Sequence, residues 1–294
     1  MNLVVGATGF LGSEICRRLK ARQLPVRGII RPTSSPNTIA NLKSLGVELV
    51  SGDLRDKESL EQACRGVNTV ISTATTTRSR QPSDSIETTD LQGQLNLVEA
   101  ARSAGVKHFI YISYSGGIGF DDPLTVAKRT VETNVRSSGM TYTILRPSYF
   151  MEVWLSPALG FDFPNAKATL YGAGTQKISW ISLGDVAELA VQSLENSAAT
   201  DAVLELGGPD ALSPLEVINI FEKISKRSYD VELISVEELE AELASAKNSL
   251  TKAFAALKLF YGKGNIIPMD KTLEKFSLSL ISVRDYANRV LLRM

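Results

Sequence analysis

Cysteine and histidine are scarce in this chain of 294 residues. Its two cysteines, Cys16 and Cys64, both fall in segments with helical patterning, so we predict no disulfide framework and a reducing, cytoplasmic compartment. The single histidine, His108, stands far along the chain from both cysteines. Since a metal cluster needs several such ligands close together, the sequence predicts no metal site.

Net charge and long apolar runs are also missing. Lys plus Arg and Asp plus Glu both number 32, so no net field attracts the chain to nucleic acid or to an anionic membrane. No stretch approaches the roughly 18 apolar residues of a membrane span, and the first apolar run, residues 3–5, is too short for a signal peptide. We therefore predict a globular protein that binds a small molecule, as a monomer or a homodimer.

What the chain does have is an alternation of short β-rich runs with longer helical patterns. Most of the runs are apolar throughout, as expected of strands that helices cover on both faces. Strands are predicted at residues 3–5, 26–30, 47–50, 69–72, 109–113, 142–145 and 203–206. Helices are predicted at residues 12–22, 36–45, 57–64, 92–104, 126–137 and 184–194. This order predicts an α/β fold with a doubly wound parallel sheet, the Rossmann type.

The regular alternation ends after Leu145, where prolines, glycines and aromatic residues become frequent. We predict a dinucleotide-binding domain at residues 1–150, to which residues 168–206 return. Residues 151–167 and 207–294 are predicted to form a smaller, mostly helical C-terminal substrate lobe. Capping-box sequences begin at Ser213 and Ser235, and the second is predicted to open a long helix over residues 235–260.

A glycine-rich turn directly follows the first strand and opens the first helix: Gly6-Ala7-Thr8-Gly9-Phe10-Leu11-Gly12. Each glycine has a physical reason, because the first permits a tight turn, the second lets the backbone approach a pyrophosphate, and the third lets the helix pack closely on the sheet. Backbone N–H groups and the helix dipole then favour phosphate. We predict cofactor contacts from Gly6, Thr8, Gly9, Phe10, Leu11 and Gly12. Tight turns without a ligand also use glycine, which is the alternative interpretation.

The second strand ends in Arg31, nineteen residues after Gly12, where an NAD-preferring fold carries an acid for the ribose hydroxyls. A guanidinium can instead pair with a 2′-phosphate, so the sequence favours NADP(H) over NAD(H). After the third strand, Asp53 and Leu54 are placed to contact the adenine. Arg31 as a solvated arginine and Asp53 as a turn cap are the alternatives.

The fourth strand runs into small side chains over residues 72–77 at the topological switch point, and Thr73 and Ala74 are predicted to line the path of the cofactor. An ordinary polar loop is the alternative. Arg78 and Arg80 follow, either facing an anionic group of the substrate or solvated.

Several of these segments together resemble the short-chain dehydrogenase/reductase superfamily, and specifically its atypical, NmrA-like branch. The resemblance spans roughly residues 1–220. It is carried by the glycine turn, by Gly52-Asp53-Leu54, by Asp90-Leu91-Gln92-Gly93-Gln94-Leu95-Asn96-Leu97, by Ala127-Lys128 and by Leu145-Arg146-Pro147. It implies a Rossmann fold and a nicotinamide cofactor.

Active members of the superfamily carry a tyrosine four residues before the matching lysine, and here that position is Leu124. Without the phenol, the usual proton relay cannot operate from this position. The resemblance to isoflavone-reductase-like members, which also lack the tyrosine, implies Lys128 as the catalytic group and Ser113 as a substrate-polarising hydroxyl. A ribose-binding role for Lys128 is equally open, and Ser113 could serve only the turn. Pro147 and Phe150 are implied to contact the nicotinamide end of the cofactor. Trp154, Phe161 and Phe163 belong to the same lobe, as cleft wall or as core.

Two functions remain open at this point. The first is an NADPH-dependent oxidoreductase that delivers hydride to a small apolar acceptor such as a quinone, an enone or a carbonyl. The second is a non-catalytic NADP(H)-sensing regulatory or scaffold protein, which the missing tyrosine favours. An isomerase that retains its nicotinamide is a third and weaker hypothesis.

Overall fold

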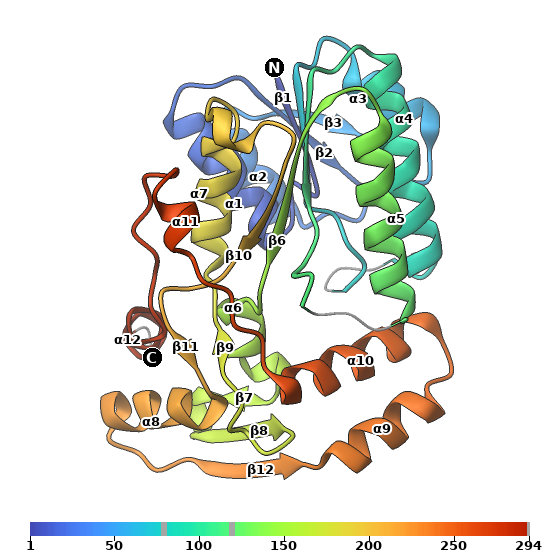
Figure 1. Ribbon diagram of the computed structural model, residues 1–294. Helices are drawn as coiled ribbons and strands as arrows, with labels where there is room; N and C mark the ends of the chain where they lie inside the picture. The colour runs from blue at the N-terminus through green and yellow to red at the C-terminus, as the bar shows by residue number, and fades with distance from the viewer. Residues whose placement is uncertain (78–80, 118–120, 293–294) are drawn as a thin grey trace. The chain divides into compact units, whose positions relative to one another are not determined.

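The computed structural model describes residues 1–77, 81–117 and 121–292, and its central element is a seven-stranded sheet (Figure 1). The strand order is β10-β6-β5-β4-β1-β2-β3, and the pairings from β3 to β6 are parallel. The strands of this sheet are β1 (Asn2–Val5), β2 (Val26–Ile30), β3 (Glu48–Ser51), β4 (Thr69–Ser72), β5 (His108–Ile112), β6 (Thr141–Pro147) and β10 (Ala202–Leu206). From β1, strands β2 and β3 are added on one side, and β4, β5 and β6 are added on the other. This change of direction is the topological switch point of a doubly wound sheet.

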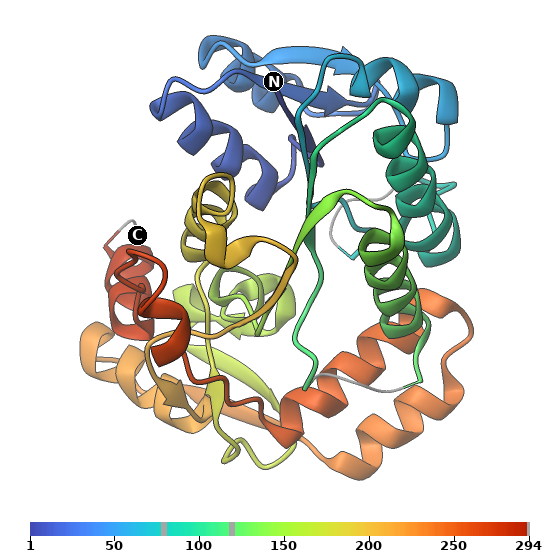
Figure 2. The same cartoon turned by 45° about the horizontal axis from the view of Figure 1, so that its top comes forward.

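Helices cover both faces of this sheet. Figure 2 shows α1 on one side of it and α4 and α5 on the other. The helices between the strands are α1 (Phe10–Ala21), α2 (Pro36–Ser44), α3 (Lys57–Cys64), the π-helix η1 (Ile86–Gly93), α4 (Gln94–Ser103), α5 (Pro123–Ser137) and α7 (Leu183–Gln192). Burial on both faces explains why β1 and β4 have no exposed position. The predicted α/β doubly wound fold is confirmed.

The helix ends follow local sequence signals. The Asp56 carboxylate accepts hydrogen bonds from the N–H groups of Glu58 and Ser59, and so caps α3. Gly46 and Gly105 adopt positive φ just past α2 and α4, as expected at helix C-termini. The helix predicted at residues 92–104 begins earlier, because the capping box of Ser85 and Thr88 opens η1, which continues directly into α4.

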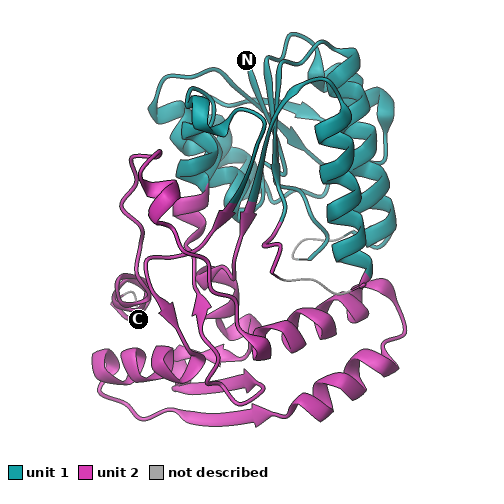
Figure 3. Cartoon of the chain, in the orientation of Figure 1, with its two compact units in different colours: residues 1–113, 123–145, 187–204 teal, residues 114–122, 146–186, 205–294 magenta. Residues whose placement is uncertain are grey.

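The chain divides into two compact units, coloured separately in Figure 3. Unit 1 comprises residues 1–113, 123–145 and 187–204, and unit 2 comprises residues 114–122, 146–186 and 205–294. Residues 168–186, which the sequence assigns to the dinucleotide-binding domain, belong to unit 2. The physical reason is strand pairing: β8 (Lys167–Tyr171) pairs with β7 (Phe161–Asp162) and β12 (Asp230–Ile234) in a separate three-stranded sheet.

Unit 2 also contains several short strands and helices. Its other short strands are β9 (Ile178–Ser179) and β11 (Ala211–Leu212). Its helices include α6 (Met151–Trp154), η2 (Pro157–Leu159), η3 (Phe163–Asn165), α8 (Pro214–Ser225), α9 (Val236–Ser245), α10 (Ser249–Lys263), α11 (Asp270–Leu273) and α12 (Val283–Leu291), and η4 (Ser197–Ala199) lies in unit 1. The capping boxes predicted at Ser213 and Ser235 are both present.

The single long helix predicted over residues 235–260 is wrong, because two helices fill this range. α9 ends at Ser245, where Ala246 turns to extended backbone. Asn248 then caps α10, its side chain accepting from the Thr251 N–H. A capping residue inside an apparently periodic helical pattern is enough to break it, since Asn competes for the backbone N–H groups of the next turn.

None of the described residues forms a helix that is both long and apolar enough to cross a membrane.

Candidate functional site

In the glycine turn after β1, backbone atoms lie so close together that side chains have no room. Gly6 adopts φ +86°, and its carbonyl accepts a hydrogen bond of 2.9 Å from the Gly9 N–H. A Cβ at residue 12 would overlap the Gly6 carbonyl oxygen, so only glycine fits at that position of α1. The turn is therefore held tightly closed by contacts that no other residue type permits.

The glycine turn also contacts Thr73 and Ala74, the two residues that directly follow β4. The Thr73 N–H donates to the Val5 carbonyl at 2.9 Å, and the Thr73 hydroxyl donates to it at 3.1 Å. A Cβ at Gly6 would stand 2.6 Å from the Thr73 hydroxyl and 2.9 Å from the Ala74 nitrogen. Four predicted cofactor residues, Gly6, Gly12, Thr73 and Ala74, are thus brought together at one edge of the sheet.

These features fit a dinucleotide. Among the described residues, a Cβ at Gly9 would meet only the Gly6 carbonyl oxygen, at 3.2 Å, and α1 begins at Phe10 with no acidic residue in its first turn. Phe10 is 57% exposed and Thr8 half-buried, whereas Leu11 is buried in the core. Of these three predicted contacts, Leu11 can reach a ligand only through its backbone.

Four charged side chains gather where β2 and β3 end, and we call them the edge cluster: Arg31, Asp53, Arg55 and Asp84. The Arg31 guanidinium donates to the Asp84 carboxylate at 2.7 Å. Arg55 donates two side-chain hydrogen bonds to Asp53, at 2.8 and 2.7 Å, and these hold the pKa of Asp53 below its usual range. The predicted adenine contact Asp53 is therefore occupied by an arginine, while the side chain of Leu54 packs in the core.

A second group lies where β4 and β5 end, and we call it the inner cluster: Thr76, Asp90 and Lys128. One Asp90 oxygen accepts from the Thr76 N–H at 3.0 Å and from its hydroxyl at 2.5 Å. The other Asp90 oxygen lies 3.9 Å from the Lys128 amine, and no residue in the described part of the chain donates a hydrogen bond to it. Asp90 belongs to the π-helix η1, a form that often marks functional positions.

Lys128 itself is almost wholly buried on α5. Its amine donates to the Ile112 carbonyl at the end of β5, at 3.3 Å, and lies 5.1 Å from the centre of the Tyr111 ring. Burial lowers the pKa of Lys128, although the carboxylates of Asp90 and Glu132 act in the opposite direction. An amine desolvated in this way gives up its proton more readily than one in water.

Ser113 follows Ile112 directly and is buried as well. Its hydroxyl accepts from the Arg129 guanidinium at 3.1 Å, and its N–H donates to the Leu145 carbonyl at 2.8 Å. Ser113 and Lys128 are thus both held at the end of β5, Ser113 through the neighbour of Lys128 on α5.

The remaining predicted residues lie in unit 2. The Pro147 carbonyl accepts from the Ser115 N–H at 2.9 Å, and Phe150 forms an isolated bridge with Ile181. Phe161 packs edge-on against Phe221, with ring centres 4.8 Å apart, and is therefore core. Trp154 and Phe163 are partly buried against the same cluster. Arg78 and Arg80 lie outside the described residues.

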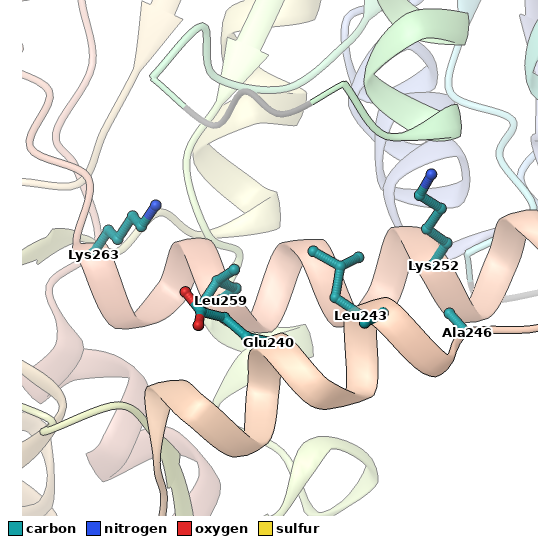
Figure 4. Close-up of a pocket in the computed structure, with 7 residues that line it drawn as sticks. Glu240, Leu243, Ala246, Lys252, Leu259 and Lys263 are labelled. Atoms are coloured by element: carbon teal, nitrogen blue, oxygen red, sulfur yellow. The ribbon is translucent and has the colours of Figure 1, made fainter.

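Unit 2 also carries a hollow of about 500 Å³ on the helix pair α9 and α10 (Figure 4). Its centre is apolar, with Leu243 and Leu259, and Lys252 and Lys263 both belong to its lining on α10. Nothing in the sequence patterning marked this hollow, because its lining is spread over two helices that the sequence joins into one. No group of three metal-ligating side chains occurs among the residues described.

Three residues of the two clusters were not singled out from the sequence. Asp84 and Arg55 lie in loops with no motif, and only the fold brings them to Arg31. Asp90 was quoted among the residues of the family resemblance, but the sequence gives no sign that it faces Lys128. One signal could have identified Asp90 as a site residue: it is the carboxylate at the start of a segment that resembles a family motif.

The chain is similar to several known proteins. The chain matches the model of the NmrA-like family over residues 2–287. It is 31% identical over 264 residues to an NAD(P)H azoreductase of Xenophilus azovorans, which covers 85% of this chain and 86% of the relative. It is also 30% identical over 224 residues to the photosystem II assembly factor Ycf39 of Synechocystis, covering 76% of this chain and 67% of the relative.

The fold is that of a solved reductase. The NADPH-dependent quinone oxidoreductase QOR2 of Escherichia coli, solved with NADPH, superimposes with a TM-score of 0.80 at 22% identity, covering 99% of this chain and all of the other. The glycine turn, the doubly wound sheet and the match over nearly the full length all lead to one conclusion. The chain belongs to the NmrA-like family of Rossmann-fold proteins.

Proposed function

We propose that this protein is an NADPH-dependent reductase that transfers hydride to a small apolar acceptor such as a quinone, an enone or a carbonyl. The observation that carries the proposal is the buried amine of Lys128, set at the end of β5 with a lowered pKa. The NAD(P)H azoreductase relative supports a reductase function, since its alignment with this chain covers most of both proteins.

The cofactor is assigned to unit 1 by the fit of the glycine turn. Gly6, Thr8, Gly9, Phe10, Leu11 and Gly12 would hold the pyrophosphate, with Thr73 and Ala74 beside them and Arg31, Asp53 and Leu54 toward the adenosine. When bound, the cofactor supplies the hydride.

The chain's own residues supply the proton. Lys128 can donate from its ammonium group, because its Ile112 contact uses only one of three N–H donors. Burial lowers the cost of releasing that proton near neutral pH, and Ser113 is placed to polarise the acceptor oxygen or nitrogen. Lys128 would thus take over the donor role that Leu124 cannot perform.

Turnover tests this proposal directly. The purified protein is mixed with NADPH and a panel of quinones and enones, and loss of the reduced-nicotinamide absorbance is followed. Lys128→Ala and Lys128→Met should lose about a hundredfold or more in turnover while still binding NADPH. Lys107→Ala, an exposed lysine just before β5, is the matched control and should keep full activity.

A second candidate is a non-catalytic NADP(H)-binding regulator or scaffold. Leu124 in place of the tyrosine and the assembly-factor relatives favour it. Tight NADPH binding by the wild-type protein, with no turnover of any acceptor, would support this second function and contradict the first.

A further inference from the structure

The segment after β4 contacts the ends of two strands that do not neighbour β4. The side-chain amide of Gln81 donates to the Thr33 hydroxyl after β2 at 2.6 Å, and Ser83 accepts from Arg55 after β3. In the sheet, β1 separates β4 from β2 and β3. The segment at residues 81–84 therefore reaches the β2 side of β1, the side on which Arg31 lies.

Asp84 is the buried centre of these contacts, with only 1% of its side chain exposed. One of its oxygens accepts from Arg31 at 2.7 Å and from the Gln81 N–H at 2.8 Å. The other has no hydrogen-bond partner among the described residues and lies 3.5 Å from the Arg55 guanidinium. A buried carboxylate is thus placed against both arginines of the edge cluster.

The charges of the edge cluster cancel, since two arginines face two aspartates. A 2′-phosphate binds well where cations are in excess, and it is repelled by a carboxylate that shares its cation. A ribose 2′-hydroxyl carries no charge and can donate a hydrogen bond to a carboxylate. Asp84 therefore lowers the affinity for the phosphorylated cofactor and leaves the unphosphorylated one unaffected or favoured.

Resting on the proposed function, we propose that Asp84 is a specificity-determining residue: it holds Arg31 in an ion pair that competes with the 2′-phosphate, so that the protein prefers NADPH over NADH only weakly. Arg31 supplies the preference and Asp84 limits it.

The experiment compares adenosine 2′,5′-bisphosphate with adenosine 5′-monophosphate by calorimetry at fixed ionic strength, on the full chain. The wild-type protein should prefer the bisphosphate by less than about thirtyfold, since a partly exposed arginine already paired gains little from a second anion. Asp84→Asn should raise this preference by about tenfold or more, mainly through tighter binding of the bisphosphate. The asparagine oxygen can still accept from the Gln81 N–H, so the turn is retained.

Glu61→Gln is the matched control, because it removes the same charge from an exposed position on α3 and should leave the preference unchanged. A wild-type preference above about thirtyfold would overturn the role of Asp84 without any variant, even if Asp84→Asn failed to fold. An unchanged preference in a folded Asp84→Asn protein would also overturn it. If the wild-type protein bound neither nucleotide, the proposed function itself would fail.

Discussion

The edge cluster and the inner cluster lie at the same edge of one sheet, yet they treat their cations differently. In the edge cluster, the side chains of Arg31 and Arg55 are 24% and 28% exposed. In the inner cluster, the Lys128 side chain is only 5% exposed. Both clusters bury an aspartate almost completely, Asp84 in one and Asp90 in the other.

The difference in side-chain exposure means that the two clusters suit different chemical tasks. A guanidinium about a quarter exposed can exchange one anion for another, which suits recognition of a phosphate. A desolvated amine beside a fixed carboxylate has an altered proton affinity, which suits proton transfer. The glycine turn belongs to neither cluster, because it contributes backbone groups alone.

The largest effect is expected from Gly12→Val, which disrupts the glycine turn itself. The added side chain would overlap the Gly6 carbonyl, so we expect NADPH binding to be lost and stability to fall by about 3 kcal/mol or more. Calorimetry and urea denaturation measure the two effects. Gly66→Ala is the comparison variant for binding: its Cβ would meet nothing within 4 Å, but its φ of +68° strains an alanine, so it should lose some stability and keep NADPH binding. Normal binding by a folded Gly12→Val protein would contradict the assignment of the turn.

Asp90→Asn tests the inner cluster alone. The Asp90 charge raises the proton affinity of Lys128, so its removal should lower the Lys128 pKa further. If protonated Lys128 is the acid, the alkaline limb of the pH–rate profile should move to lower pH, with turnover at neutral pH falling about tenfold and NADPH affinity nearly unchanged.

Glu132→Gln is the matched control for this shift. Glu132 also raises the Lys128 pKa, but less than Asp90 does, so the alkaline limb should move in the same direction by a smaller amount. A profile that does not move in Asp90→Asn would remove Lys128 as the titrating acid. A purely structural role for Asp90 would lower the rate at every pH without moving the limb.

Arg31→Asp tests the edge cluster alone. It replaces the cation with a second carboxylate beside Asp84, so the affinity for NADPH should fall by about tenfold or more relative to NADH, while turnover with saturating cofactor stays near normal. Lys43→Asp, an exposed position on α2 with the same change of charge, is the control. An unchanged ratio of NADPH to NADH affinity would show that Arg31 does not contact the 2′-phosphate.

The sequence predicted the parts of the molecule whose physics is local. Three features have their cause within a few residues: the turn that only glycine can form, the mainly apolar strands, and the capping boxes of Ser213 and Ser235. It therefore predicted a doubly wound parallel sheet and the sequence of the glycine turn, but not the order of the strands in the sheet.

What the sequence could not predict depends on contacts between distant residues. Strand β12 pairs with β8 more than sixty residues away, and its alternation of exposed and half-buried residues is too short to stand out. Asp84 lies 53 residues from Arg31, and no pattern relates the two. Each arginine of the edge cluster pairs with an aspartate only in the folded protein. The sequence alone therefore does not show that a carboxylate competes with a phosphate for Arg31.

The smallest effect is expected at His108, at the opposite end of β5 from the inner cluster. Burial lowers its pKa from 6.5, and its ring lies 2.8 Å from the Thr143 hydroxyl. Because the unfolded chain then binds a proton more readily, His108 stabilises the fold above about pH 6.5, and this contribution is lost as the pH falls below that value. Urea denaturation at pH 7.5 and 5.5 should show a smaller loss of stability on acidification in His108→Gln than in the wild-type protein. The NADPH affinity of this variant should stay unchanged, since the histidine lies at the amino end of the strand. An equal loss in both proteins would mean that folding does not lower the pKa of His108.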